Sequence, residues 1–211
     1  MAFGTGGGDA GGRGHGAGED RPRVGVLALQ GDVSEHLDYF RRAGAAVRPV
    51  RVPLDLEGLE GLVLPGGEST AIGRLMERAG LLAAVAERSR RGDLALFGTC
   101  AGLILLARQV EGGQPPRLGL LDLAVVRNGY GRQVDSFEAD LEVPALGDAP
   151  VRALFIRAPV VESTGAGVEV LARFRGRPVL VRQGRCMAST FHPELGEDLR
   201  VARLFLSLLA A

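Results

Sequence analysis

A strand–turn–helix pattern recurs three times in the first half of the chain, and it constrains the fold more than any other feature. Short apolar runs at residues 24–29, 62–64 and 94–97 are typical of strands buried on both faces. A turn and then a helical pattern follow each run. Strands that alternate with helices favour a parallel sheet covered on both sides. The sequence therefore predicts an α/β, three-layer sandwich around a central, mainly parallel (mixed) sheet.

The helices are predicted from their start and stop signals. Asp32 and Glu35 have the spacing of a capping residue and its N3 partner, and Gly44 can close the helix that follows. Further helices are expected at Ser69–Gly80, 81–91, Leu103–Arg108 and Leu199–Leu209. Shorter, alternating segments in the second half predict strands, some of them antiparallel, which complete the sheet and add a flap: Val134–Val143, Arg152–Ile156, Val168–Phe174, Pro178–Arg182 and Cys186–Phe191.

The first 22 residues differ in composition from the rest. Residues 1–22 are rich in glycine and have little to bury, so we expect a disordered tail followed by one domain at 23–211. The tail lacks the charged-then-apolar order of a secretory signal, and the chain has no apolar run near ~18 residues. We therefore expect a protein with no membrane association.

Charge and cysteine content narrow the class of function. The chain has 25 basic and 25 acidic residues, so neither nucleic acid nor an anionic membrane is an expected partner. All the basic residues are arginine, which excludes Schiff-base lysine chemistry. The two cysteines, Cys100 and Cys186, make no disulfide framework and favour a cytoplasmic protein with reduced thiols.

Cys100 is the candidate nucleophile. A buried strand ends in Gly98-Thr99-Cys100-Ala101-Gly102, and a helix starts at once. This is the layout of a nucleophile elbow with cysteine in place of serine, a sharp turn that lifts one side chain above the sheet. The alternative is a small buried core thiol, the usual state of an intracellular cysteine. Cys186 lies in a strand-like run without an elbow, and we expect it in the core.

His192 is the candidate base. His15 lies in the glycine-rich tail, and His36 on the first helix is expected to be a surface or interface residue. Pro193 favours an extended backbone at His192, and residues i and i+2 of an extended segment point to one side. Glu194 is therefore expected beside His192, orienting its ring. A cysteine, a histidine and a carboxylate are the set needed for acyl transfer through a thioester.

These motifs resemble the class I (triad) glutamine amidotransferases, and more closely the glutaminase subunits of pyridoxal 5′-phosphate synthase. The general class rests on residues 98–102 and 191–194, and the closer resemblance on four further blocks: 29–36, 64–70, 127–133 and 155–159. One departure is visible, since Ala71 stands where the family commonly has threonine. The resemblance implies a class I glutamine amidotransferase-like (flavodoxin-like) architecture and hydrolysis of L-glutamine to glutamate and ammonia.

The resemblance also implies a set of site residues. Glutamine contacts are expected from Gly67, Glu68, Ser69, Arg127, Ile156 and Arg157. The oxyanion and activation region is expected at Gln30, Gly31 and Ala101, with the first helix and His36 on a docking surface. Without the resemblance, the expectation would be different. Arg127 and Arg157 would be interpreted as ordinary surface arginines, and residues 66–69 as an ordinary turn in which Ser69 caps a helix.

No metal and no organic cofactor is expected in this subunit. The resemblance implies a synthase (lyase) subunit as the partner, in a large hetero-oligomer that uses the ammonia for pyridoxal 5′-phosphate, vitamin B6. Two alternatives stay open. In the first, the chain is a glutaminase subunit that serves a different synthase. In the second, it is a non-catalytic binding subunit with the same fold.

Overall fold

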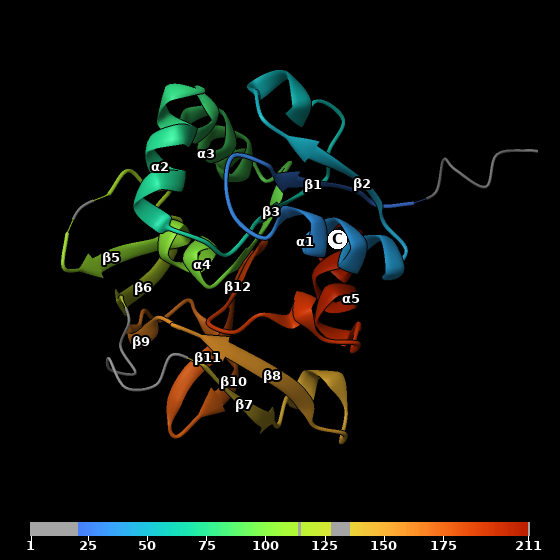
Figure 1. The fold of residues 1–211 in the computed structure, drawn as a ribbon, viewed down its shortest axis with the longest axis vertical. Coiled ribbons are helices and arrows are strands. Elements are labelled where there is room, and N and C mark those ends of the chain that lie inside the picture. Colours follow the sequence, from blue (N-terminus) through green and yellow to red (C-terminus); the bar gives the residue numbers. More distant parts are fainter. Residues whose placement is uncertain (1–20, 114, 128–135, 211) are drawn as a thin grey trace, which may run out of the picture.

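A seven-stranded sheet forms the centre of the molecule. The computed structural model describes residues 21–113, 115–127 and 136–210. Its main sheet has the order β10-β11-β12-β4-β3-β1-β2 (Figure 1). The strands in that order are Glu169–Phe174, Arg177–Gln183, Cys186–Ser189, Ala95–Thr99, Gly61–Leu64, Arg23–Leu27 and Ala46–Val50. The five strands from β12 to β2 are parallel, whereas β10 and β11 are antiparallel. The predicted mainly parallel sheet is confirmed.

Helices cover both faces of this sheet. One layer contains α1 (Val33–Arg42) and α5 (Arg200–Ser207), and the other contains α2 (Ser69–Arg78), α3 (Leu81–Arg91) and α4 (Ala101–Leu106). The alternation of side chains along buried strands explains both layers. In β3, for example, Leu62 and Leu64 pack in the core on the α2–α4 side and Val63 packs in the core on the α1–α5 side. The three-layer prediction is confirmed.

Two smaller sheets extend the central one. The first contains β5 (Ala107–Glu111), β6 (Leu121–Val126) and β9 (Val160–Thr164), and the second pairs β7 (Ser136–Leu141) with β8 (Val151–Ile156). Short 3-10 helices lie at Pro53–Leu56 (η1), Pro144–Leu146 (η2) and Pro193–Leu195 (η3).

The sequence-based boundaries fail in several places. The helix predicted to reach Arg108 ends at Leu106, because the next residue begins β5 and pairs with β6. The strands at 46–50, 107–111, 121–126 and 160–164 were not predicted, since each forms only by pairing with another segment of the chain. Asp32 does precede α1, but its side chain makes no capping hydrogen bond. Glu68, and not Ser69, caps α2 by accepting from Thr70 N and Ala71 N.

Most of the expected tail lies outside the described residues, which begin at residue 21. The carbonyl of Pro22 accepts a hydrogen bond from Ala46 N at 2.9 Å, so backbone pairing starts just before β1. Within the described part of the chain, each helix is too short or too polar to cross a bilayer.

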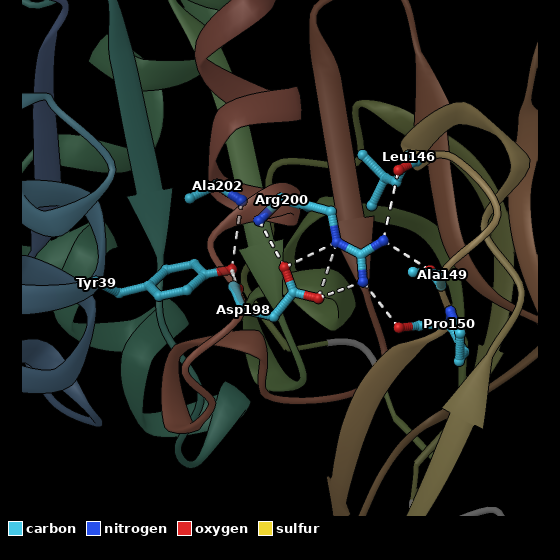
Figure 2. Close-up of polar contacts among 7 residues, drawn as sticks. All are labelled: Tyr39, Leu146, Ala149, Pro150, Asp198, Arg200 and Ala202. Carbon is cyan, nitrogen blue, oxygen red and sulfur yellow. Dashed lines mark hydrogen bonds and ion pairs between the residues drawn. The ribbon is translucent and has the colours of Figure 1, made fainter.

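A polar network, which we call the Arg200 clamp, fixes the start of α5 (Figure 2). The Arg200 guanidinium donates to both carboxylate oxygens of Asp198 and to the carbonyls of residues 146, 149 and 150. The Tyr39 hydroxyl donates to the Asp198 carbonyl at 2.9 Å and accepts from Ala202 N at 3.3 Å. The clamp therefore ties α1, η2 and α5 together.

Candidate active site

The candidate residues gather at one edge of the central sheet. Cys100 directly follows β4, His192 comes shortly after β12, and the segments at 30–32 and 66–69 come after β1 and β3. These four strands are neighbours and parallel, so their carboxyl ends lie side by side. Ligands of open parallel sheets bind at this edge.

Cys100 sits on a sharp strand-to-helix turn, as predicted. Its φ of 49° and ψ of −101° are an uncommon conformation for a residue with a side chain. The flanking glycines make the turn possible. A Cβ at Gly98 would lie 2.5 Å from the Gly102 carbonyl carbon, and one at Gly102 would collide with the Leu64 carbonyl. The turn leaves the Cys100 side chain 8% exposed, with Sγ 3.8 Å from the Ile156 carbonyl oxygen.

His192 and Glu194 form a buried pair. His192 Nδ1 lies 2.6 Å from Glu194 Oε1, and the side chains are 5% and 0% exposed. The predicted contact is present, but the route differs from the prediction. Residues 193–195 form a 3-10 helix instead of an extended segment, and this turn brings Glu194 back to the ring.

The surroundings of His192 favour its charged form. Burial lowers the pKa of His192, but hydrogen bonding and charge from Cys100 and Glu194 outweigh burial and raise the pKa to about 10. The ring is therefore an imidazolium at neutral pH. A cationic imidazole is a ready proton donor to a leaving group.

The second cysteine has a different environment. Cys186 is buried in β12, and its Sγ lies 3.7 Å from Ser89 Oγ. Burial raises the pKa of the Cys186 thiol, with a smaller opposing effect from Ser89. The thiol therefore stays protonated, in agreement with the expected core position.

The placement of His36 on a docking surface is wrong. Its side chain is 0% exposed and its Nε2 lies 3.0 Å from Thr99 Oγ1 and 3.5 Å from Glu194 Oε2. The helical pattern contained the signal, because His36 lies one turn before Phe40, a core residue on the same face of α1. The prediction rested on the position of His36 one turn from the start of the helix and did not consider which face of the helix carries it.

Two glycine-containing loops pack against each other above the elbow. Gly31 has a φ of 105° and Gly67 a φ of 137°, a region that glycine adopts readily. A Cβ at Gly31 would collide with the Gly66 carbonyl oxygen, so only glycine permits this approach. Gln30 Oε1 accepts a hydrogen bond from Glu68 N at 3.1 Å. The predicted activation loop therefore lies directly on the predicted glutamine-binding loop.

Glu68 and Arg127 pair with each other. Arg127 Nη2 lies 2.8 Å from Glu68 Oε1, and Arg127 Nη1 donates to Thr70 Oγ1 at 3.0 Å. Partial burial raises the pKa of Glu68, but the N–H groups of Thr70 and Ala71, with Arg127, lower it below its ordinary value. Glu68 is thus a carboxylate held in place, and one charge of each sign lies at the same edge of the site.

A cavity of about 510 Å³ joins these elements. Ten of the predicted site residues line it: Gln30, Gly67, Glu68, Ser69, Cys100, Ala101, Arg127, Ile156, Arg157 and His192. Glu194 lies behind His192, and Gly31 lies against the neighbouring loop. Three other residues that line the cavity were not predicted from the sequence: Asp32, Ile104 and Leu195. The Ser69 hydroxyl is buried at this cavity and has no hydrogen-bond partner in the described structure.

One cluster of potential metal ligands coincides with the site. Asp32, His192 and Glu194 offer ligand atoms that all lie within 4.8 Å of one another, among the residues that the structure describes. The His192 nitrogen that faces the carboxylates, Nδ1, is already engaged by Glu194 at 2.6 Å. This arrangement is suited to proton transfer, in which a carboxylate orients the ring and the other nitrogen faces the thiol.

Residues 128–133 of the motif at 127–133 lie outside the described residues.

Comparison with known families and structures agrees with this geometry. Residues 26–210 match the SNO glutamine amidotransferase family. A relative from Thermus thermophilus, named pyridoxal 5′-phosphate synthase subunit PdxT, is 59% identical over 186 residues, which cover 88% of this chain and 96% of the relative. A protein of the same name from Pelotomaculum thermopropionicum is 54% identical, and the match covers 87% of this chain and 93% of that protein.

A solved structure described as a crystal structure of glutamine amidotransferase has the same fold. It superposes with a TM-score of 0.86 at 53% identity, and the match covers 89% of this chain and 99% of the other.

Proposed function

This chain belongs to the SNO glutamine amidotransferase family, and from that premise we propose that it hydrolyses L-glutamine with Cys100 as nucleophile and supplies the ammonia to a pyridoxal 5′-phosphate synthase. The observation that carries the proposal is the junction of Cys100, on its strained turn, with the buried His192–Glu194 pair at one cavity.

The chemistry begins with the thiolate of Cys100. Its sulfur attacks the side-chain amide carbon of glutamine and forms a tetrahedral intermediate with a negative oxygen. His192 gives its proton to the leaving nitrogen, so ammonia departs and a γ-glutamyl thioester remains on Cys100. Glu194 keeps the ring oriented and balances its charge. Water, activated by the now neutral His192, then hydrolyses the thioester to glutamate and restores the thiolate.

The negative oxygen needs donors that are in place before the reaction. The backbone N–H groups of Ala101, at the start of α4, and of Gly67 are the proposed donors. The segment at Gln30–Gly31 packs on the Gly67 loop. A change in this segment would therefore alter the donor geometry, which gives a partner docked nearby a means to control the reaction.

The walls of the cavity suit a free α-amino acid. Glutamine carries an ammonium and a carboxylate, and the Glu68–Arg127 pair presents one charge of each sign. The unpaired Ser69 hydroxyl is available as a further partner. Ile156 and Arg157 line the same cavity as Cys100, and we propose that both contact the bound glutamine.

A synthase partner follows from the chemistry and from the names of the relatives. Protonation to ammonium in bulk water would remove the nucleophilicity of the product, so ammonia must pass directly to its acceptor. Both relatives are named as subunits of pyridoxal 5′-phosphate synthase. We place the reaction in the cytoplasm in a large hetero-oligomer with the synthase subunit, and the two free thiols are compatible with a reducing compartment.

The test mixes this chain with the synthase subunit and measures glutamate release and pyridoxal 5′-phosphate formation. Cys100→Ala is expected to abolish both activities when glutamine is the nitrogen source and to leave synthesis from added ammonium salt intact. The Cys186→Ala variant is the matched control and should retain both activities. Equal loss with glutamine and with ammonium would contradict the proposal.

A further inference from the structure

His36 is a buried histidine that the proposed mechanism does not use. It lies on α1 with a side chain that is 0% exposed. Its Nδ1 is 2.6 Å from the backbone carbonyl oxygen of Asp32. A carbonyl oxygen can only accept a hydrogen bond, so Nδ1 carries a proton and donates it to Asp32. The chemistry of the ring therefore depends on its second nitrogen, Nε2.

Nε2 of His36 faces the carboxylate of the triad. It lies 3.5 Å from Glu194 Oε2 and 3.0 Å from Thr99 Oγ1. Glu194 Oε1 is occupied by His192, whereas Oε2 is buried and has no hydrogen-bond partner in the described structure. A buried carboxylate oxygen without a donor is costly. His36 is a titratable group that faces this oxygen. When the ring carries a proton on both nitrogens, a small adjustment lets Nε2 donate to Oε2 while Nδ1 keeps its bond to Asp32.

We propose that His36 is a positioning residue that acts on Glu194, and through Glu194 on His192, and that it connects the triad to the loop at Gln30–Asp32. Glu194 then lies between two imidazoles, one at each carboxylate oxygen. The ring of His36 restricts rotation of the carboxylate and so fixes the direction of the His192 ring. This inference rests on the proposed glutaminase function, which it deepens.

The contacts of His36 extend from the loop to the triad. At the cavity, the Gln30 side chain accepts a hydrogen bond from Glu68 N. Two residues later, the backbone carbonyl of Asp32 accepts a hydrogen bond from His36 Nδ1. A displacement of this loop therefore moves the acceptor of Nδ1. One turn after His36, Tyr39 is bonded into the Arg200 clamp (Figure 2). The clamp thus holds α1 close to His36, and a displaced loop would act on the ring from the first turn of the helix.

Two substitutions separate the contacts of the two ring nitrogens. In His36→Gln the side-chain amide can occupy the place of Nε2 and reach Glu194, whereas in His36→Asn it can occupy only the place of Nδ1 and reach Asp32. Both variants stay polar. Assayed with the synthase subunit, His36→Asn is expected to lower kcat for glutamine on the order of 10²-fold with KM unchanged, because a misplaced catalytic group costs about this much. His36→Gln should recover most of the activity.

Asp38→Asn is the control on the same helix, because Asp38 is exposed and pairs with Arg41 and Arg42 on the side of α1 away from the triad, and it should leave kcat unchanged. A change in KM and kcat together in all three variants would show a general role in stability and would overturn the proposal. So would the reverse order, with His36→Asn active and His36→Gln inactive.

A double-mutant cycle with Glu194→Gln tests the route of the effect. If His36 acts through Glu194, His36→Asn causes no further loss of kcat in the Glu194→Gln background. An equal loss in both backgrounds means that His36 acts elsewhere, for example through Thr99, and overturns the proposal. A measurement without any His36 variant is also decisive. The 15N resonance of His36 Nε2 should shift in Glu194→Gln, and an unchanged resonance contradicts the contact.

The failure of the proposed function is distinguishable from the failure of this inference. If the wild-type chain with synthase releases no glutamate, the proposed function fails. If the wild type is active and Cys100→Ala is inactive, but His36→Asn matches the wild type, only the role of His36 is wrong.

Discussion

Two polar networks flank the segment from His192 to Ala202, and they differ in how completely their atoms are satisfied. In the Arg200 clamp, the guanidinium meets one carboxylate and three carbonyls, and the Tyr39 hydroxyl both donates and accepts. In the triad region, Glu194 Oε2 and Ser69 Oγ are buried without hydrogen-bond partners among the described residues, and Cys100 has a strained backbone. Satisfied networks stabilise a fold, whereas unsatisfied atoms and strain concentrate at functional sites.

The largest expected effect is at Cys100, where substitutions test whether the triad region gives up stability for function. Both Cys100→Gly and Cys100→Ala are expected to reduce glutamine hydrolysis about 10⁶-fold, because the nucleophile is lost. Their stabilities should differ, since glycine tolerates a φ of 49° and alanine does not. We expect Cys100→Gly to have the larger free energy of unfolding by about 1 kcal/mol. Urea denaturation with an activity assay measures both quantities, and an alanine variant as stable as the glycine variant would show that the turn is unstrained.

The second test uses pH at His192. Its folded pKa of about 10 lies above the ordinary value of 6.5, so its favourable contribution is fully present below about pH 6.5 and is lost as pH rises through about 10. The free energy of unfolding of the wild type minus that of His192→Gln should fall by a few kcal/mol between about pH 6 and pH 10. Denaturation curves at several pH values measure this difference. A difference independent of pH would mean that His192 is not held as a cation.

A substitution in the Arg200 clamp has the smallest expected effect, and it should change the stability of the protein but not its activity. Arg200→Ala removes charged hydrogen bonds to Asp198 and to backbone carbonyls, so we expect a loss of about 2 kcal/mol in the free energy of unfolding. The kcat per folded molecule should stay unchanged. Arg91→Ala, which breaks an exposed pair with Glu87, is the control and should cost less than about 1 kcal/mol. A loss of kcat in Arg200→Ala at full folding would erase the distinction between the two networks.

The sequence predicted those parts of the site that depend on local chain geometry. The elbow at Cys100 could be predicted because a side chain at Gly98 or Gly102 would collide with the backbone of the turn or of β3. The pairing of His192 with Glu194 could be predicted because the two residues are close in the chain, although the turn between them is a 3-10 helix. Family resemblance supplied the residues of the cavity wall, such as Arg127, which the spacing alone left as an ordinary surface residue.

The parts that failed depend on contacts between distant segments. Whether the residues from Ala107 onward continue a helix or enter a strand depends on pairing with β6, which the local pattern does not contain. His36 meets Thr99 and Glu194, which are far from it in the chain. A histidine on a helix can face water or the core, and only the neighbouring elements decide. The burial of His36 therefore became visible only with the tertiary structure.

The two sulfurs of the chain also have a practical consequence. Cys100 opens onto the cavity, whereas Cys186 is kept as a neutral thiol inside β12. A glutamine analogue that carries an electrophile should alkylate one site per chain. The mass increment of a single adduct would then count the competent molecules in a preparation, and turnover numbers could be normalised to that fraction instead of to total protein.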